Sequence, residues 1–245
     1  MDLDFRRCSI SGSELWIGLP PDSDRGRLVI ERWPEAPKSV LFVEGPEQGE
    51  LVAAFVASPF AEAVENLMIG TSHDYIGTDH PPPYDFSGAV AALKGATLPA
   101  LKRLILGDME LLFNGHGYHG RLGDITHVFD IAPQLEELRI CGNAEISRPV
   151  RHDLLRRLVV TVDDVAGHCE PWSESSFENL LASRFVRLAE CDLSLEADGV
   201  APYRIPEIFF SGVGFAALEA VSVDCLADGD ATRFSAWKAG RGLRW

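Results

Sequence analysis

The feature that most constrains the fold of this chain is the nine-residue segment Leu135–Asn143. Aliphatic residues recur within it at Leu135, Leu138 and Ile140, and an asparagine closes the run. This spacing is typical of a short strand whose apolar side chains enter a shared core, followed by a turn in which the asparagine side chain binds the backbone. A strand this short cannot bury its apolar edge alone, so the segment predicts neighbours of the same kind.

Segments with similar spacing do recur along the chain. Their middle inward residues are Leu67, Leu104, Leu138, Leu158, Cys191 and Val221, which are 37, 34, 20, 33 and 30 residues apart. Leucine-rich repeats usually run about 20 to 29 residues, so most of these connections have room for a helix or an insertion. We therefore predict an α/β fold, a leucine-rich-repeat-like solenoid with a parallel concave sheet and with helices or loops on the convex side.

The connections contain segments that fit this plan. Apolar spacing predicts helices over Asp124–Ala132 and Ser173–Ser183, the second capped by its serines with Glu178, and a helical return over Phe86–Leu93. Thr71–Asp85 includes three consecutive prolines, which cannot donate backbone hydrogen bonds. We expect that segment to leave the stack.

The first part of the chain differs from the rest. The segments Ser13–Leu19 and Arg27–Trp33 flank a turn-rich stretch, as do Ser39–Val43 and Leu51–Val56, and both pairs are typical of hairpins. Such an antiparallel unit would cover the exposed end of the first repeat. The expected domains are an N-terminal β-hairpin cap over residues 1–58 and an irregular solenoid with a C-terminal cap over residues 59–245, closed by the tail residues Trp237, Arg241, Arg244 and Trp245.

The chain is strongly acidic, with a formal net charge of -15. An acidic surface repels phosphate backbones and anionic lipids, which argues against nucleic acid and membrane binding and favours a basic partner. The amino terminus lacks the basic and apolar regions of a signal peptide, and no apolar run is long enough to cross a membrane. Five scattered cysteines predict reduced thiols rather than a disulfide framework. We therefore expect a cytoplasmic protein.

A family resemblance lies in the segments Leu104–Asp108, Gly123–Ile125 with the helix after it, Pro133–Ile140, and Arg151–His152 leading to Leu155–Val160. In these the chain resembles bacterial leucine-rich-repeat proteins of irregular repeat length, some of whose relatives carry a WGR domain. The resemblance covers roughly residues 60–228. The N-terminal hairpins and the proline-rich segment have no counterpart in it, and we find no WGR motif. The resemblance implies a binding solenoid and no catalytic activity.

On each predicted strand, the residues that alternate with the inward ones face out along the concave sheet. That face would carry Asn66, Met68, Arg103, Ile105, Glu137, Arg139, Arg157, Val159, Glu190, Asp192, Ser222 and Asp224. Its charges are basic and mixed in the middle and acidic later, and interspersed charges set the register and the choice of a protein partner. The predicted partner-binding residues are its charged members, Arg103, Glu137, Arg139, Arg157, Glu190, Asp192 and Asp224.

Other residues hint at chemistry but lack the context for it. His116 and His119 have a spacing compatible with a metal, but nothing fixes a third or fourth ligand. Cys169 lies beside His168, yet adjacent residues seldom reach the geometry of a nucleophile and its base. The segment Gly115–Gly120 mimics a nucleotide-binding glycine pattern without the required βαβ context. The sequence thus identifies no catalytic, metal or cofactor-binding residue.

We therefore expect a non-enzymatic module that binds a protein partner through the concave face. A sharper form of this hypothesis is an immunity protein or antitoxin that occludes a basic secreted bacterial toxin. The alternative is a metal- or thiol-dependent enzyme that uses His116, His119 or Cys169.

Overall fold

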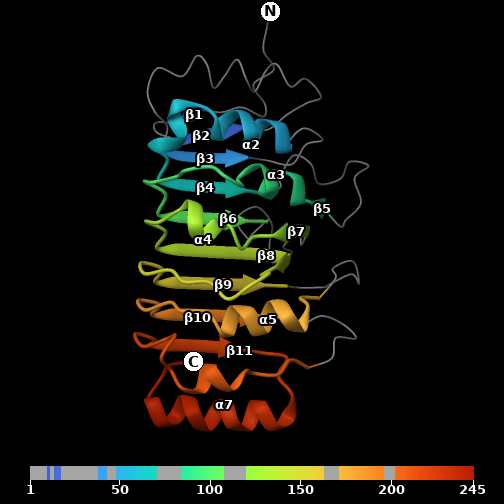
Figure 1. Ribbon diagram of the computed structural model, residues 1–245, viewed down its shortest axis with the longest axis vertical. Coiled ribbons are helices and arrows are strands. Elements are labelled where there is room, and N and C mark those ends of the chain that lie inside the picture. Colours follow the sequence, from blue (N-terminus) through green and yellow to red (C-terminus); the bar gives the residue numbers. More distant parts are fainter. Residues whose placement is uncertain are drawn as a thin grey trace, which may run out of the picture.

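The computed structural model describes residues 10–11, 14–17, 38–42, 48–70, 84–107, 120–162, 171–195 and 202–245. Its central feature is a long sheet whose strands follow one another in chain order, β1-β2-β3-β4-β6-β8-β9-β10-β11 (Figure 1). These strands are β1 (Ile10–Ser11), β2 (Glu14–Ile17), β3 (Ser39–Phe42), β4 (Asn66–Ile69), β6 (Arg103–Leu106), β8 (Glu137–Glu145), β9 (Arg157–Thr161), β10 (Glu190–Ser194) and β11 (Ala220–Val223).

Neighbouring strands run parallel from β2 to β11, whereas β1 and β2 pair antiparallel. The protein is therefore α/β with a mostly parallel sheet, as predicted. The residues aligned across the sheet are Leu67, Leu104, Leu138, Leu158, Cys191 and Val221. This is the row that the spacing predicted. The strands keep one register, so the unequal numbers of residues between the inward positions reflect connections of different length.

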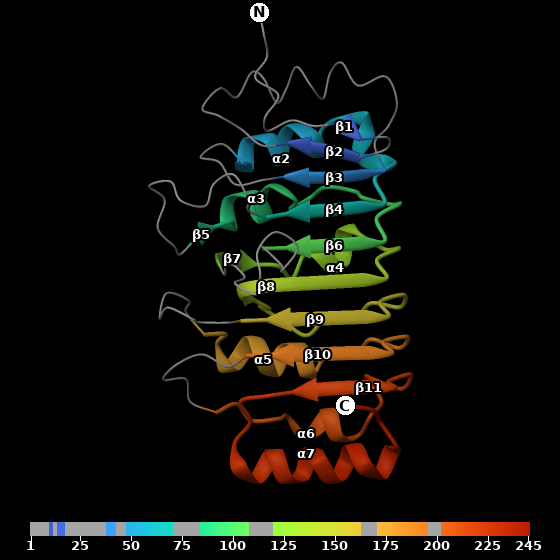
Figure 2. The same cartoon turned by 180° about the vertical axis from the view of Figure 1, so that it is seen from behind.

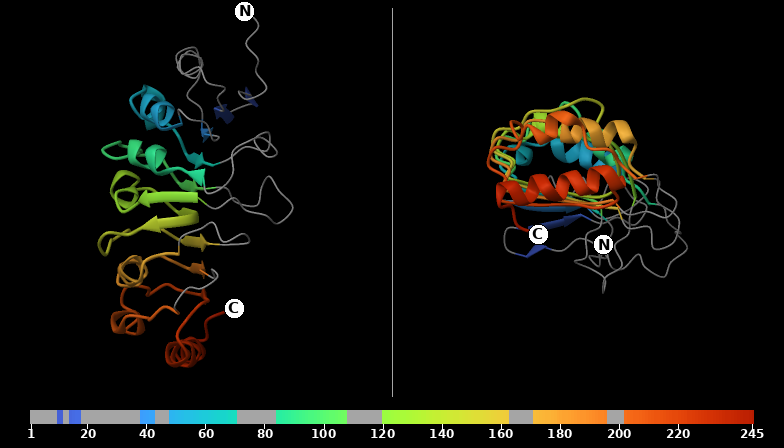
Figure 3. Two further views of the ribbon diagram at one scale, coloured as in Figure 1. Left: turned by 90° about the vertical axis from the view of Figure 1, so that its right-hand side faces the viewer. Right: turned by 90° about the horizontal axis from the view of Figure 1, so that it is seen from below.

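The helices lie on one side of the sheet, as the two opposite views and the side view show (Figures 2 and 3). They are α2 (Gln48–Val56), η2 (Pro59–Glu62), α3 (Ser87–Ala92), α4 (Val128–Ile131), α5 (Glu174–Leu181), α6 (Glu207–Phe210) and α7 (Asp228–Arg241). The aligned leucines are fully buried between sheet and helices. Within the described part of the chain, no helix has both the length and the apolar character needed to cross a membrane.

A turn of constant form leads into six strands of the main sheet, β4, β6, β8, β9, β10 and β11. The Lys102 carbonyl accepts the backbone N–H groups of Glu136 and Glu137, and the Glu136 carbonyl accepts those of Arg156 and Arg157. The same pair of hydrogen bonds to one carbonyl oxygen recurs at Lys38, Glu65, Arg156 and Ala189. Each turn is thus tied to the next by main-chain bonds that need no particular side chain.

The second predicted hairpin is wrong. Leu51–Val56 is not a strand but part of helix α2, whose buried residues Gln48, Leu51, Val52 and Phe55 have the i, i+3, i+4, i+7 spacing of a helix. Strand β3 pairs parallel with both β2 and β4, so this region continues the main sheet instead of forming an antiparallel cap. Arg27–Trp33 and residues 71–83 of the proline-rich segment lie outside the described residues. The boundary at residue 58 stays a prediction.

Strand β8 is long because its two halves have different partners. Its first half lies between β6 and β9, whereas Gly142–Glu145 pairs with β7 (Gly120–Asp124), which pairs in turn with β5 (Tyr84–Asp85). The halves meet at Gly142, which has a φ of 123°, and a Cβ there would lie 2.2 Å from the Gly120 carbonyl oxygen. Because the chain before α4 forms β7, the helix predicted over Asp124–Ala132 shortens to Val128–Ile131.

The predicted helices over Phe86–Leu93 and Ser173–Ser183 are confirmed as α3 and α5. The hydroxyl of Ser173 caps α5 by accepting the Ser176 N–H. The tail forms the longest described helix, α7, which the sequence did not predict. Its Trp237 packs on Phe209 with ring centroids 4.8 Å apart, as expected of a closing residue, whereas Trp245 is 57% exposed.

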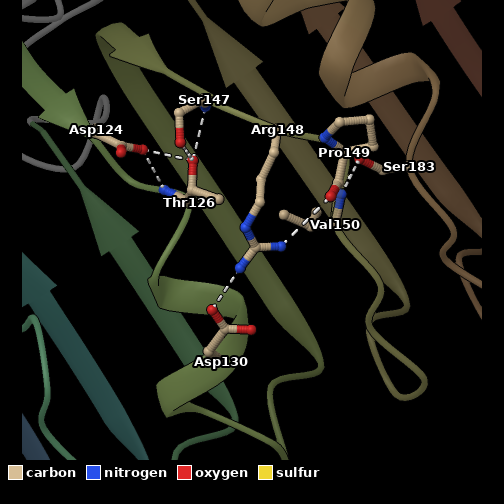
Figure 4. A network of polar contacts seen from close by, with 8 residues as sticks. All are labelled: Asp124, Thr126, Asp130, Ser147, Arg148, Pro149, Val150 and Ser183. Atoms are coloured by element: carbon tan, nitrogen blue, oxygen red, sulfur yellow. Dashed lines mark hydrogen bonds and ion pairs between the residues drawn. The ribbon is translucent and has the colours of Figure 1, made fainter.

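The shortest connection between neighbouring parallel strands, residues 146–156 between β8 and β9, here called the short connection, contains no helix although its residues are all described. Side chains from segments on either side bind its backbone instead (Figure 4). The Thr126 hydroxyl accepts the Ser147 N–H at 2.8 Å, and the Ser183 hydroxyl accepts the Val150 N–H at 2.9 Å. The connection therefore has its polar groups satisfied without making a helix of its own.

His152 completes this connection. It is buried, its Nδ1 accepts the N–H groups of Leu155 at 3.0 Å and Leu154 at 3.3 Å, and its Nε2 therefore donates to the Ala132 carbonyl at 2.9 Å. At the equivalent point before β8, β10 and β11, the N–H binds a backbone carbonyl three residues earlier. In this repeat the imidazole takes the place of that backbone acceptor.

Candidate functional site

The predicted partner-binding residues on the strands alternate with the buried inward residues, so they lie on the face of the sheet opposite the helices, here called the outer face. The helices lie on the other side of the sheet (Figure 3). Two rows of residues in register cross the outer face. The first row is Asn66, Arg103, Glu137, Arg157, Glu190 and Ala220, and the second is Met68, Ile105, Arg139, Val159, Asp192 and Ser222. Six of the seven predicted residues belong to these rows, and Asp224 follows directly after β11.

Glu137 is the centre of an ion-pair network on this face. Its carboxylate oxygens lie 3.3 Å from Arg103 Nε and 3.7 Å from Arg157 Nη1, and one of them also pairs with Arg139. Arg157 Nε lies 3.3 Å from a carboxylate oxygen of Glu190. The charges of the first row thus alternate from β6 to β10, an order that favours the pairing of these strands.

The contacts of this network are charge pairs more than aligned hydrogen bonds. Arg103 Nε and Arg157 Nε are buried atoms that form no hydrogen bond, although each lies 3.3 Å from a carboxylate oxygen. Their N–H groups therefore do not point at the nearby oxygen. The side chains of Arg103 and Arg157 are 39% and 43% exposed, so solvent screens these pairs and keeps each contribution small.

The far end of the outer face is acidic. Among the described residues, no cation forms an ion pair with Asp192 or Asp224. The Asp224 carboxylate accepts the Ser194 hydroxyl at 2.9 Å and the Leu195 N–H at 2.5 Å. Burial raises the pKa of Asp192, and the charge of Asp224 raises it further, against smaller opposing effects of a hydrogen bond from Ser222 and of the charge of Arg157. An ionised Asp192 is therefore disfavoured in the folded chain, and an external cation would relieve that cost.

A small apolar cluster interrupts the outer face. Ile105 and Cys141 are 4% and 2% exposed, and Met68 and Val159 pack against them. Ile105 lies on the outer face as predicted, in register with Met68 and Arg139, but its side chain is buried there in this second cluster. The second row is thus apolar at several strands and charged at Arg139 and Asp192.

Ser194 belongs to this surface and was not predicted. It lies two residues after Asp192 on β10, and its hydroxyl binds Asp224 across the sheet. The alternation Glu190, Asp192, Ser194 places it on the outer face, so continuing the period-two pattern by one step would have identified it.

The residues of the enzyme alternative, His116, His119 and Cys169, lie outside the described residues. In the part of the chain that the structure covers, no group of three or more His, Cys, Asp or Glu could hold a metal ion. The described thiols of Cys141, Cys191 and Cys225 are free of disulfides. Burial raises the pKa of the Cys191 thiol to about 12, so it is not a nucleophile at neutral pH.

Comparison with protein-family models gave no match, and neither did comparison with curated proteins or with solved structures.

Proposed function

We propose that this protein is a non-enzymatic binding module, built as a leucine-rich-repeat-like solenoid, whose outer face is the concave surface that recognises a protein partner. An aligned apolar row at irregular separations, covered by helices on one side of the sheet, suits such an architecture. Side chains on a regular sheet are held in place before binding, which lowers the entropic cost of recognition.

The observation that carries the proposal is the uneven charge of the outer face. Its arginines lie beside the carboxylates of Glu137 and Glu190, whereas Asp192 and Asp224 form no ion pair among the described residues, and Arg157 acts on Asp192 only through a weaker electrostatic effect. The face therefore suits a partner that brings a lysine or arginine to the acidic end. The formal charge of -15 would steer a basic protein toward it.

The sharper form of the proposal is an immunity protein or antitoxin that occludes a basic secreted toxin. The acidic end and the net charge suit an inhibitor that acts by occupying the surface of a basic protein.

An affinity capture with three baits tests the proposal. The baits are the wild-type chain, the double variant D192N/D224N on the outer face, and the double variant E174Q/E178Q, which removes the same charge from exposed positions of α5. We expect a basic protein to bind the wild type and the α5 variant, and its affinity for the outer-face variant to fall at least about tenfold in titration with purified components. Equal binding to all three baits would contradict the use of the acidic end.

A further inference from the structure

A pair of arginines meets on the side of the molecule away from the outer face. Arg151 and Arg184 form a parallel bridge between the short connection and the turn after α5. The bonds around it run from the His152 N–H to the Arg184 carbonyl at 3.0 Å and from the Arg184 N–H to the Val150 carbonyl at 2.8 Å. Bridged residues of neighbouring extended segments project to the same side, so two guanidinium groups share one small exposed region.

One carboxylate serves both cations. Arg151 binds Asp153 through two nitrogens, at 2.9 and 3.3 Å. The pKa of Asp153 is lowered chiefly by this hydrogen bond from Arg151, and the charge of Arg184 also lowers it. Yet within the described residues the Arg184 guanidinium forms no hydrogen bond or ion pair of its own. The pair therefore has one carboxylate for two arginines, whereas on the outer face Glu137 and Glu190 pair with Arg103, Arg139 and Arg157.

The other neighbour of Arg184 offers no compensation either. The next repeat brings Gly214 beside it, and a Cβ on that glycine would lie 3.8 Å from the Arg184 Cα. Gly214 has no side chain to cover or neutralise the arginine, and Val213 beside it is 66% exposed. The region thus combines a guanidinium that has no hydrogen bond or ion pair of its own among the described residues with the exposed side chain of Val213.

We propose that Arg184, next to Arg151, binds a carboxylate of an acidic protein segment. The bidentate contact of Arg151 with Asp153 shows the geometry, because a planar guanidinium matches the two oxygens of a carboxylate. An external carboxylate on Arg184 completes a balanced set of two cations and two anions. The distant negative charges of the chain oppose this little, since charges beyond the Debye length of about 8 Å are screened at physiological salt. This site is separate from the outer face and does not depend on its function.

The test measures binding of a fluorescent hexaglutamate peptide to the full chain by anisotropy. We expect saturable binding by the wild type. The affinity of Arg184→Gln for the peptide should be about five- to tenfold weaker. The matched control is Arg187→Gln, which removes an equally exposed cation three residues along the same turn but outside the bridge. Its affinity should stay at the wild-type value.

A second variant tests the direction of the effect. Asp153→Asn removes the internal carboxylate that competes for the two arginines, so the peptide should bind more tightly than to the wild type. The proposal is overturned if the wild type shows no saturable binding, if R184Q and R187Q weaken it equally, or if D153N weakens it. Circular dichroism spectra identical to the wild type would establish that the exposed substitutions leave the fold intact.

Discussion

Among the described glycines, Gly107 is the one at which an added Cβ would come closest to the backbone of a neighbouring segment. It has a φ of +84°, and a Cβ there would lie 2.0 Å from the Cys141 carbonyl oxygen. Gly95 has nearly the same backbone angle, +81°, but nothing within 4 Å of an added Cβ. The two glycines therefore separate the effect of a left-handed backbone from the effect of close packing.

We predict that Gly95→Ala lowers the free energy of unfolding by about 1 kcal/mol, through backbone strain alone. Gly107→Ala should lower it by at least about 3 kcal/mol, because the methyl group must displace the backbone of β8 as well. Urea unfolding of both variants measures the difference. Equal losses would mean that the approach of Gly107 to Cys141 is not a constraint on the fold.

Glu137 gives a second prediction at this scale, because its carboxylate forms ion pairs with three arginines, whereas that of Glu190 pairs with Arg157. Glu137→Gln leaves Arg103, Arg139 and Arg157 close together without the central carboxylate. We expect it to lower the free energy of unfolding by about 1 to 2 kcal/mol, after allowance for solvent screening, and Glu190→Gln by about 0.5 kcal/mol or less. Thermal unfolding in low and high salt checks both values, since added salt should reduce the difference in stability between the two variants. If Glu190→Gln lowered the free energy of unfolding more than Glu137→Gln, Glu137 would not be the centre of the ion-pair network.

At the scale of elements, the connection between β8 and β9 shows how two neighbouring parallel strands can be joined without a helix between them. Hydroxyls from its neighbours and its own imidazole satisfy the backbone that a helix would satisfy internally. The adjacent helix α5 thereby has two roles: it packs on the sheet and it supplies Ser176 and Asn179 to Ile146 of the short connection.

We predict that His152→Ala lowers the free energy of unfolding by about 3 kcal/mol, because a buried carbonyl and two N–H groups lose their partner and a cavity opens. His152→Asn should cost less, since its side-chain oxygen can still accept from Leu155. Chemical unfolding measures both. If the asparagine variant were as unstable as the alanine variant, acceptance at Nδ1 would not be the role of this side chain.

At the scale of the whole molecule, stability and proposed function oppose each other at the acidic end. The pKa of Asp192 is raised, first by burial and then by Asp224. The ionised form therefore costs stability at neutral pH, and this cost disappears as the pH falls through the raised pKa of the folded state. Retaining such a charge is expected where a partner, rather than the fold, makes use of it.

We predict that Asp192→Asn is more stable than the wild type at pH 7, and that this advantage shrinks as the pH falls through the raised pKa of Asp192 and is lost below the unfolded-state value of about 4. The same variant should bind a basic partner less tightly. Unfolding measured across this pH range checks the first statement. A variant that is less stable than the wild type at pH 7 would show that the carboxylate supports the fold instead.

Much of the sheet could be predicted because its determinants are local. The inward positions from Leu67 to Val221 follow from a short pattern that repeats in each strand, and the pattern holds even where Cys191 replaces leucine. Leu51–Val56 misled the same reasoning, because a six-residue apolar run fits a strand and a helix equally well. The tertiary packing favours the helix over the strand: Gly49 of α2 lies against the backbone of Gly88 in α3, so the helices of two neighbouring connections are in contact.

The sequence by itself determined which side chains turn to the core and which to the outer face, since alternation along a strand is a property of a few adjacent residues. Only the tertiary structure decided which outer charges meet. Glu137 lies 34 residues from Arg103 and 20 from Arg157, and the register that joins them depends on how each connection folds back. The same holds for Arg151 and Arg184, whose meeting requires the short connection and the turn after α5 to lie side by side. Contacts across such distances depend on the closure of whole loops, which no local pattern encodes.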